Sequence, residues 1–444
     1  MFKLILKISI RNVFANWKQS LSALISIISG FIAIVIFSGY ISEIFEFYYE
    51  LDSKLGMKGH LIIEKEGASS VLGRADVWEY SLNSQDQKTI FDFLNHNNDI
   101  IEAKARFLRI SGSIDTNESS NIYRGLAYDP NEGAAIRTKK WEKNTYFGRP
   151  LSKTDEESEV MVIGLRLAQK LNCLPDPMPL LDDYFIQLEQ SSVDRPLNCR
   201  EQNFQVLGMT EKSQVNALDI NAIGSYDLGY KEYDERFISL PLSVAQKLFD
   251  TDKISYIVVT LKSKELIAQF NKQLNEYFKN NLSHVLSQKW EDHPLGEFYT
   301  NTKSLLTVFR NFVMLIVLFV VGMSVFNTFI KLIKERTKEV GMFRSLGFNP
   351  KFIRKLYVCE ALVLALLGCV IGIVISYIFS SAINFSSITY DSGLFSFKKP
   401  LRINTEFFIY IQTIAIIVLI ATTAAFVAIR KPSKENIIKL LLHS

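Results

Sequence analysis

The sequence predicts an α-helical membrane protein with four transmembrane helices plus a large α/β extracytoplasmic domain inserted between helices 1 and 2. Three observations support this fold class: four long runs without Asp, Glu, Lys or Arg, a long mixed α/β stretch between the first two runs, and basic residues concentrated in three short segments. With 48% hydrophobic and 22% charged residues, the 444-residue chain is too apolar to be disordered and too charged to be a membrane bundle from end to end. Its net charge of +4 does not indicate a nucleic-acid-binding protein.

The first segment, 1–18, predicts a cytoplasmic amphipathic helix lying at the inner membrane surface. Lys3, Lys7, Arg11 and Lys18 fall within about 80° of one another at the helical repeat, with apolar residues between them. A simple cytoplasmic stub is the alternative.

Each of the four uncharged runs reaches the ~20 residues that a helix needs to cross the hydrocarbon of a bilayer. A buried core helix rarely carries so many uncharged residues in a row. The first run is too long for a cleaved signal peptide and no A-x-A-like site follows it, so we expect an uncleaved anchor. The predicted transmembrane helices are 19–42, 304–330, 358–383 and 407–429.

The distribution of charge predicts the orientation. The two ends, 1–18 and 430–444, and the loop 331–357 together carry 16 basic residues against 3 acidic ones, and the remainder of the chain has a net charge of −9. Cytoplasmic segments of membrane proteins are enriched in Lys and Arg, so both termini and this loop are expected in the cytoplasm. The protein itself is expected in the inner membrane of a bacterial cell. The domain at 43–303 and the loop at 384–406 are then periplasmic.

The periplasmic segment is long enough to build a core of its own. Its patterns predict strands at 60–64, 159–163, 204–209, 237–240 and 254–261, and helices at 86–94, 165–171 and 264–278. Prolines at 175, 177 and 179 indicate a boundary between two lobes. We expect one lobe formed by about 60–172 together with 262–300. A second lobe, at about 180–260, is inserted between these two segments.

The four cysteines divide into two pairs. Cys173 and Cys199 lie in the periplasmic segment, where either a disulfide or two free thiols is consistent with the sequence. Cys359 and Cys369 lie in or beside the third predicted span, where we expect them to pack against neighbouring helices.

Motifs for catalysis are absent from the sequence. It contains no P-loop, no H-E-x-x-H and no G-x-S-x-G, and its five histidines lack the spacing of zinc ligands. His293 lies near three carboxylates, but we expect a solvated loop there. No catalytic residue, no metal site and no cofactor are therefore predicted in this chain.

The loop at 331–357 contains Gly341 and Gly347, which interrupt it, and Pro350, which begins or restarts a helix that continues into the third span. It predicts a short amphipathic helix across the inner membrane surface. Such a helix could present Met342, Phe343, Leu346 and Phe348 to a groove on a cytoplasmic partner. A cationic loop that only sets the topology is the alternative.

The run ERTKEVGMFRSLG from Glu335 to Gly347 resembles the ER-x-x-E-I/V-G-x-x-R-A-x-G signature of FtsX-like ABC permeases. This superfamily includes the MacB and lipoprotein-releasing LolC/LolE branches. The layout of one span, a large external domain and three more spans resembles it too. Weaker similarities to the MacB-type periplasmic core are GHLII from Gly59, VIGLRLAQKL from Val162, FQVLG from Phe204 and SLPLSVAQKLF from Ser239.

The resemblance implies that the loop is a coupling helix that docks on an ABC ATPase. Residues that match the motif, and are therefore expected to couple to the ATPase, are Glu335, Arg336, Glu339, Gly341, Arg344 and Gly347. Glu360, near Arg354 and Lys355 in the sequence, is expected either to form an ion pair at the membrane edge or to transmit motion. Gly368 and Gly372 are expected to allow close approach of two helices.

The resemblance also implies the partners. MacB carries its own ATPase, whereas here ATP and magnesium are expected to bind a separate dimer of cytoplasmic ABC ATPase subunits. A second permease, identical or different, membrane lipids and a periplasmic carrier or adaptor complete the expected partners, and nucleic acid is not among them. The expected function is mechanical release or movement of a lipidated or hydrophobic client on the periplasmic side. MacB-like efflux through an adaptor and an outer-membrane channel, and FtsX-like regulation of an external enzyme, are the alternatives.

Overall fold

The computed structural model divides the chain into two units. A helical unit contains Met1–Glu46, Lys303–Ile388 and Leu401–Ser444, and an α/β unit contains Phe47–Thr302 and Thr389–Pro400. The structure describes residues 2–15, 17–117, 119–141, 145–174, 195–201, 203–228, 231–386, 388–390 and 399–434. The proline-rich segment and the end of the C-terminal tail, both singled out in the sequence, lie outside the described residues.

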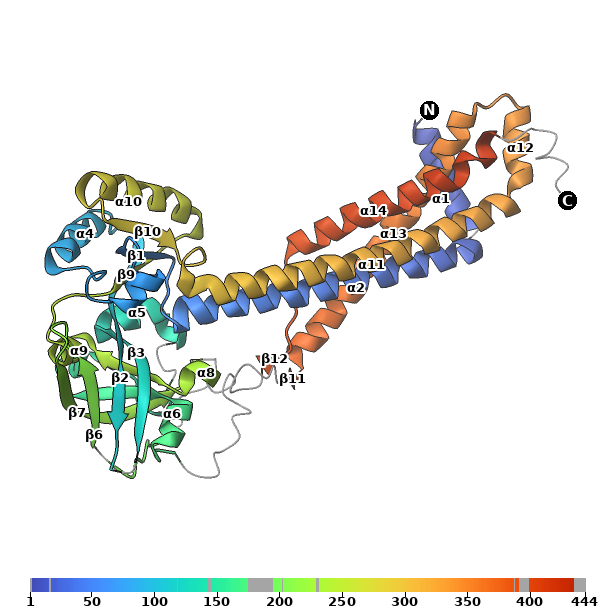
Figure 1. Ribbon diagram of the computed structural model, residues 1–444. Helices are drawn as coiled ribbons and strands as arrows, with labels where there is room; N and C mark the ends of the chain where they lie inside the picture. Colours follow the sequence, from blue (N-terminus) through green and yellow to red (C-terminus); the bar gives the residue numbers. More distant parts are fainter. Residues whose placement is uncertain are drawn as a thin grey trace. The chain divides into compact units, whose positions relative to one another are not determined.

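The predicted membrane helices are confirmed as four long apolar helices, each of sufficient length and hydropathy to span a bilayer (Figure 1). They are α2 (Trp17–Glu50), α11 (Glu297–Glu335), α13 (Pro350–Phe385) and α14 (Phe407–Arg430). Two short helices accompany them, α1 (Phe2–Ala15) and α12 (Thr337–Ser345). Both α2 and α11 extend beyond the predicted spans, because an uncharged run marks what the bilayer accepts and not where helical hydrogen bonding ends.

Small residues allow α13 to lie close to α2. A Cβ atom added at Gly368 would stand 2.5 Å from Cγ2 of Ile27, and one added at Gly372 would stand 2.8 Å from Cδ1 of Phe31. Both distances are shorter than a van der Waals contact, so a larger side chain at either glycine would force the two helices apart.

The α/β unit contains a ten-stranded sheet with the strand order β10-β1-β9-β2-β3-β8-β5-β7-β4, and β6 pairs with both β2 and β7. The pairing of β6 closes a ring of six strands: β2, β3, β8, β5, β7 and β6. The strands are β1 (Leu61–Lys65), β2 (Ile101–Asp115), β3 (Ser120–Tyr128), β4 (Thr145–Gly148), β5 (Val160–Gly164), β6 (Asn203–Met209), β7 (Val215–Tyr226), β8 (Phe237–Pro241), β9 (Tyr256–Leu261) and β10 (Val285–Lys289).

Helices cover both parts of this sheet. Near β1, β9 and β10, α4 and α10 supply apolar side chains to a core that continues into the ring of strands (Figure 1). An Asn83–Asp86 capping box starts α4, and Ile90 and Leu94, one turn apart, are its buried face. The helices of this unit are α3 (Val71–Ala75), α4 (Ser84–His96), α5 (Pro130–Trp141), α6 (Leu165–Lys170), α8 (Lys231–Asp234), α9 (Leu242–Phe249) and α10 (Ile267–Asn281).

The strand β2 changes its pairing partners along its length. Its first half, 101–107, pairs with β9, and its second half, 107–115, pairs with β3 and, over its last four residues, β6. The strand β2 is therefore shared by two parts of one sheet. The sequence did not indicate this, because a continuous strand carries no Gly or Pro signal where its partners change.

His60, beside the start of β1, is a buried titratable group. Its Nδ1 accepts a hydrogen bond of 3.0 Å from the backbone N–H of Leu261. Burial, together with the positive charges of Lys54 and Lys264, lowers the pKa of His60 to about 4. The neutral imidazole is therefore the form that fits the folded unit.

We predict that this histidine makes the stability of the protein depend on pH. Since the folded-state pKa is below the unfolded value of 6.5, the contribution is complete above pH 6.5 and is lost as the pH falls toward 4. The loss amounts to roughly 3 kcal/mol. His60→Asn, which keeps an acceptor without titrating, should flatten the fall in thermal stability of the full chain between pH 7 and pH 4.5.

His96→Asn is the matched control, since His96 is exposed on α4 and its removal should leave the pH dependence unchanged. An unaltered pH dependence in His60→Asn would contradict the assignment.

Candidate coupling site

The segment between α11 and α13 is a helix followed by a tightly specified turn. Gly347 has φ +85°, a left-handed conformation that favours glycine. The N–H of Phe348 donates to the carbonyl of Phe343 (3.0 Å) and that of Gly347 donates to the carbonyl of Arg344 (3.1 Å). The rings of Phe343 and Phe348 meet edge to face at 5.7 Å. These contacts form a Schellman motif, which explains why glycine is required at this position of the loop.

The next helix begins immediately after this turn. The side chain of Asn349 accepts a hydrogen bond of 2.9 Å from the N–H of Lys351, and Pro350 occupies the first turn of α13. Phe348 also stacks on Phe352 at 4.7 Å. Because both helix ends are capped, the orientation of α12 relative to α13 is fixed by local contacts.

A buried ionic cluster connects the start of α12 to α1 and α13. The guanidinium of Arg336 lies 3.3 Å from Glu360 on α13 and 2.7 Å from Glu339 on α12. Nδ2 of Asn12 on α1 donates a hydrogen bond of 2.6 Å to Oε1 of Glu360. Arg336 is 8% exposed and Glu360 is 2% exposed, so the cluster is largely shielded from solvent. Three separate segments of the chain are therefore held together at one carboxylate.

Arg336 stays charged within this cluster. Burial by itself would lower its pKa, but the negative charges of Glu360 and Glu339 raise the pKa above its ordinary value. The guanidinium also lies over the ring of Tyr357, 5.6 Å from its centroid. A buried ion pair with further hydrogen bonds is strongly destabilised when one partner is removed.

The first helix is attached to α13 and does not stand alone. Ile5, Ser9 and Val13 form a buried stripe at helical spacing, and the Ser9 hydroxyl donates to the carbonyl of Leu356 at 3.3 Å. Lys7 and Arg11 are exposed, as an amphipathic helix requires. The structure therefore has a helix at Phe2–Ala15, within the segment 1–18 where one is predicted, and its buried face packs on α13.

The structure places the motif residues in three different environments. Arg336 and Glu339 belong to the ionic cluster, and Gly341 is buried within α12. Glu335 is exposed, Arg344 is partly exposed and Gly347 forms the turn. Of the predicted coupling residues, Arg336 and Gly341 are thus buried, whereas Glu339 and Glu335 remain exposed.

The exposed apolar residues of this segment are Met342 (49%), Leu346 (68%) and Phe348 (39%). Phe343, which was also expected on this surface, is partly buried, because it packs against a small apolar cluster that includes Ile5 and Leu356. We call Met342, Leu346 and Phe348 the α12 apolar face.

The surroundings of Glu360 differ from those suggested by neighbouring residues in the sequence. Among the residues that the structure describes, the ionic partner of Glu360 is Arg336, and no ion pair joins Glu360 to Arg354 or Lys355. Asn12 was not singled out from the sequence. The only available signal was a polar residue adjoining the apolar stripe of the first helix.

A second buried ionic cluster lies in the α/β unit and includes His293. The prediction that His293 lies in a solvated loop is therefore wrong. This residue is 1% exposed and not solvated. Its Nε2 lies 2.9 Å from Glu64, and its Nδ1 accepts from the N–H of Leu295 (3.1 Å). Arg109 also pairs with Glu64 at 3.2 Å. Because the residue after His293 starts the 3₁₀ turn Pro294–Gly296 leading into α11, this cluster ties the beginning of that helix to β1 and β2.

The geometry of this second cluster does not resemble a catalytic triad. The Ser69 hydroxyl donates to Glu64 (3.0 Å) and also lies 3.1 Å from Nε2 of His293, the same nitrogen that faces Glu64. In a triad the serine and the carboxylate contact different ring nitrogens, whereas here Nδ1 of His293 accepts from a backbone N–H. No group of three or more His, Cys, Asp or Glu with metal-ligand geometry occurs in the described ranges.

The cysteines form one disulfide and two free thiols among the described residues. Cys173 and Cys199 are joined in the α/β unit, which ties the end of α6 to the segment before β6. Cys359 and Cys369 are free and buried in α13.

We predict that Arg336→Met lowers the free energy of unfolding by about 3–5 kcal/mol, because it leaves the Glu360 carboxylate buried without its cation. The double variant Arg336→Met/Glu360→Met should recover most of this loss, since neither charge then remains. Unfolding of the full chain in detergent by heat or denaturant measures both values.

Lys338→Met, on the exposed surface of α12, is the matched control and should change stability little. Additive effects of the two substitutions in the cluster would show that Arg336 and Glu360 are not energetically coupled.

Comparison with known proteins supports the resemblance seen in the loop. Residues 311–437 match the family described as FtsX-like permease C-terminal. The ABC transporter permease YtrF of Bacillus subtilis is 38% identical over 73 residues, covering 16% of this chain and 17% of that protein. The macrolide export ATP-binding/permease protein MacB of Campylobacter jejuni is 22% identical over 270 residues, covering 59% of this chain and 37% of that protein.

Among solved structures, the periplasmic region of MacB from Actinobacillus actinomycetemcomitans is similar at 13% identity, with a TM-score of 0.33, covering 53% of this chain and 90% of that one. The matches to the two sequence relatives span less than two-fifths of their lengths. Residues 311–437, which include α12, Arg336, Glu360 and the last two spans, match an FtsX-like permease domain, and relatives that the chain resembles are ABC transporter permeases.

Proposed function

We propose that this chain is the membrane subunit of an ATP-driven ABC transporter and that α12 is its coupling helix. The observation that carries the proposal is the cluster of Arg336, Glu360 and Asn12, which connects the start of α12 to both α1 and α13. No P-loop lies within these 444 residues, so ATP and magnesium are bound by an ABC ATPase dimer, expected as separate subunits. A second permease, identical or different, completes the assembly.

The α12 apolar face is the surface offered to the ATPase. Met342 lies on the nine-residue helix α12, and Leu346 and Phe348 follow in the turn at its C-terminal end. Three large exposed apolar side chains within seven residues are suited to a hydrophobic groove on a partner. Exposed Lys338 and partly exposed Arg344 add positive charge at its edge, which can form charge-assisted bonds with a partner's carboxylates. Arg336 contributes indirectly, by holding α12 in position.

Charge supports an orientation with α12 and both termini in the cytoplasm and the α/β unit outside the inner membrane. The Cys173–Cys199 disulfide fits this assignment, because disulfides persist in oxidising compartments such as the periplasm.

The proposed mechanism is mechanical. Closure of the ATPase dimer displaces α12, and the ionic cluster passes this displacement to α1 and α13. The helix α11 begins within residues assigned to the α/β unit and continues to the start of the loop, so it can carry motion along its length. The uncharged runs 19–42, 311–330, 361–383 and 407–429 provide no charged path for a polar substrate through the membrane.

The client proposed for this mechanism is lipidated or hydrophobic and is moved or released at the outer face of the membrane, as in lipoprotein release. MacB-like efflux with a periplasmic adaptor and an outer-membrane channel is the second candidate, and the similarity to a macrolide export ATP-binding/permease protein favours it. Bound lipids and proteins that co-purify with the full chain would distinguish a lipoprotein carrier from an adaptor.

We predict that Met342→Gln/Leu346→Gln reduces the amount of ABC ATPase that co-purifies with the full chain from its native membrane by at least about tenfold. The two substitutions remove exposed apolar area that a groove would bury, while glutamine preserves side-chain length and helix propensity. Quantitative mass spectrometry of the purified complex measures the ratio of the two subunits.

Met209→Gln, which alters an equally exposed apolar residue on β6, is the matched control and should retain the ATPase. Retention at the wild-type ratio in the α12 variant would refute the docking surface. The absence of any ABC ATPase from the wild-type preparation would instead refute the proposed transporter.

A further inference from the structure

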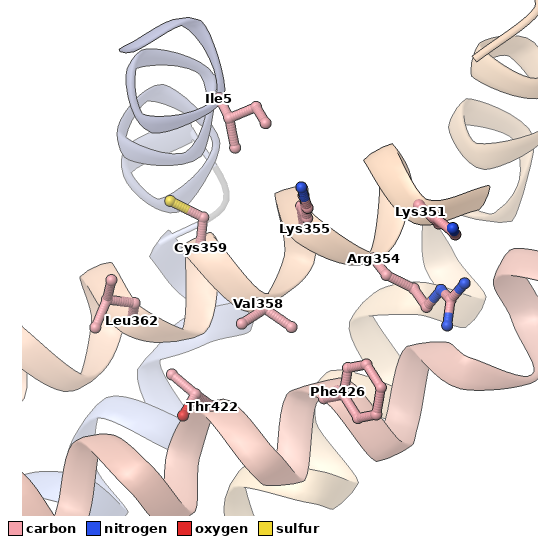
Figure 2. Close-up of a pocket in the computed structure, with 9 residues that line it drawn as sticks. All are labelled: Ile5, Lys351, Arg354, Lys355, Val358, Cys359, Leu362, Thr422 and Phe426. Carbon is pink, nitrogen blue, oxygen red and sulfur yellow. The ribbon is translucent and has the colours of Figure 1, made fainter. Parts of the chain in front are cut away.

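A hollow of about 580 Å³ lies on the helical unit between α1, α13 and α14 (Figure 2). Basic side chains on the first two turns of α13 line one end of it: Lys351, Arg354 and Lys355. Val358 and Leu362, farther along the same helix, continue the lining. The proposed coupling function does not use this hollow.

The lining changes from charged to apolar along the helix axis. Positions 351, 354, 355, 358 and 362 are spaced at three or four residues or are adjacent, so they share one face of α13. At 1.5 Å per residue, this face extends about 16 Å from Lys351 to Leu362. Charge therefore lies at the end where α13 begins, and apolar surface extends into the span.

The three cations have no carboxylate partner among the residues that the structure describes. Arg354 donates only a long hydrogen bond, 3.4 Å, to the carbonyl of Pro350 at the start of its own helix. By contrast, Arg336 in the ionic cluster is paired with two carboxylates. The uncompensated charges of the hollow favour an anionic ligand.

The rest of the lining favours a ligand that also has a hydrocarbon part. Figure 2 shows Val358 pointing from α13 toward Thr422 and Phe426 of α14. Phe426 is 45% exposed, and the side chain of Ile5 closes the hollow on the side of α1. A small inorganic anion would leave this apolar surface uncovered, whereas an acyl chain would cover it.

We propose that this hollow binds one anionic phospholipid of the surrounding membrane. Its phosphate lies among Lys351, Arg354 and Lys355, and one acyl chain follows Val358 and Leu362 into the bilayer. The bound lipid would contact α1 and α13 within one turn of Glu360, so it would also stabilise the attachment of α1.

The test uses the full chain in detergent with added phosphatidylglycerol or phosphatidylcholine, followed by native mass spectrometry and thermal unfolding. We expect one phosphatidylglycerol to be retained and to raise the unfolding temperature, with phosphatidylcholine binding much more weakly. Lys351→Gln/Arg354→Gln/Lys355→Gln should weaken phosphatidylglycerol binding on the order of 100-fold. Val358→Trp, which fills the apolar part and keeps all charges, should weaken it as well.

The matched control is Lys7→Gln/Arg11→Gln/Lys431→Gln, which removes the same charge from exposed positions outside the hollow and should retain the lipid. Equal loss in the control and the test variant would overturn the proposal, because it would indicate general attraction to anionic lipid. Inorganic phosphate or glycerol phosphate that competes at equal concentration would also overturn it, since a free anion would then suffice. A change in oligomeric state of the test variant without loss of lipid would assign the hollow to a second copy of this chain.

Discussion

The buried contact between Arg336 and Glu360 determines where α12 lies, and the account of this protein depends on it. An ion pair removed from solvent tolerates little displacement, because separating the charges exposes each of them to an apolar environment. With Asn12 on the same carboxylate, α1, the start of α12 and α13 are connected at one buried group. A helix held in this way can transfer a displacement caused by a cytoplasmic partner to the membrane spans. A flexible cationic loop would change its own conformation and would not transfer the displacement.

The positions of the spans and the loop could be predicted from the sequence because the physical signals are local. A run of about twenty uncharged residues predicts a helix that can span a bilayer. Gly347, followed by Asn349 and Pro350, indicates the end of one helix and the start of the next. The Glu360 partners could not be predicted, since Asn12 is 348 residues away in the chain. The motif drew attention to Arg336 but not to its burial, which depends on how α13 packs.

The same distinction applies to the α/β unit. Strands such as β5 and β9 were recognisable as apolar runs, and their buried patterns agree. The strand β2 was missed as the element shared by two parts of the sheet, because pairing partners are non-local. His293 was taken for a solvated residue because its neighbours in the sequence are acidic, whereas its actual partner is Glu64, at the opposite end of this unit's sequence.

The claim that the ionic cluster transmits motion is tested most directly with Glu360→Gln in the complex with the co-purifying ATPase. Hydrogen exchange in β1 and β10 of the α/β unit, measured with and without a non-hydrolysable ATP analogue, reports whether motion reaches that unit. The account predicts a nucleotide-dependent difference in the wild type and its loss in Glu360→Gln at unchanged ATPase binding. An undiminished difference in the variant would contradict the account.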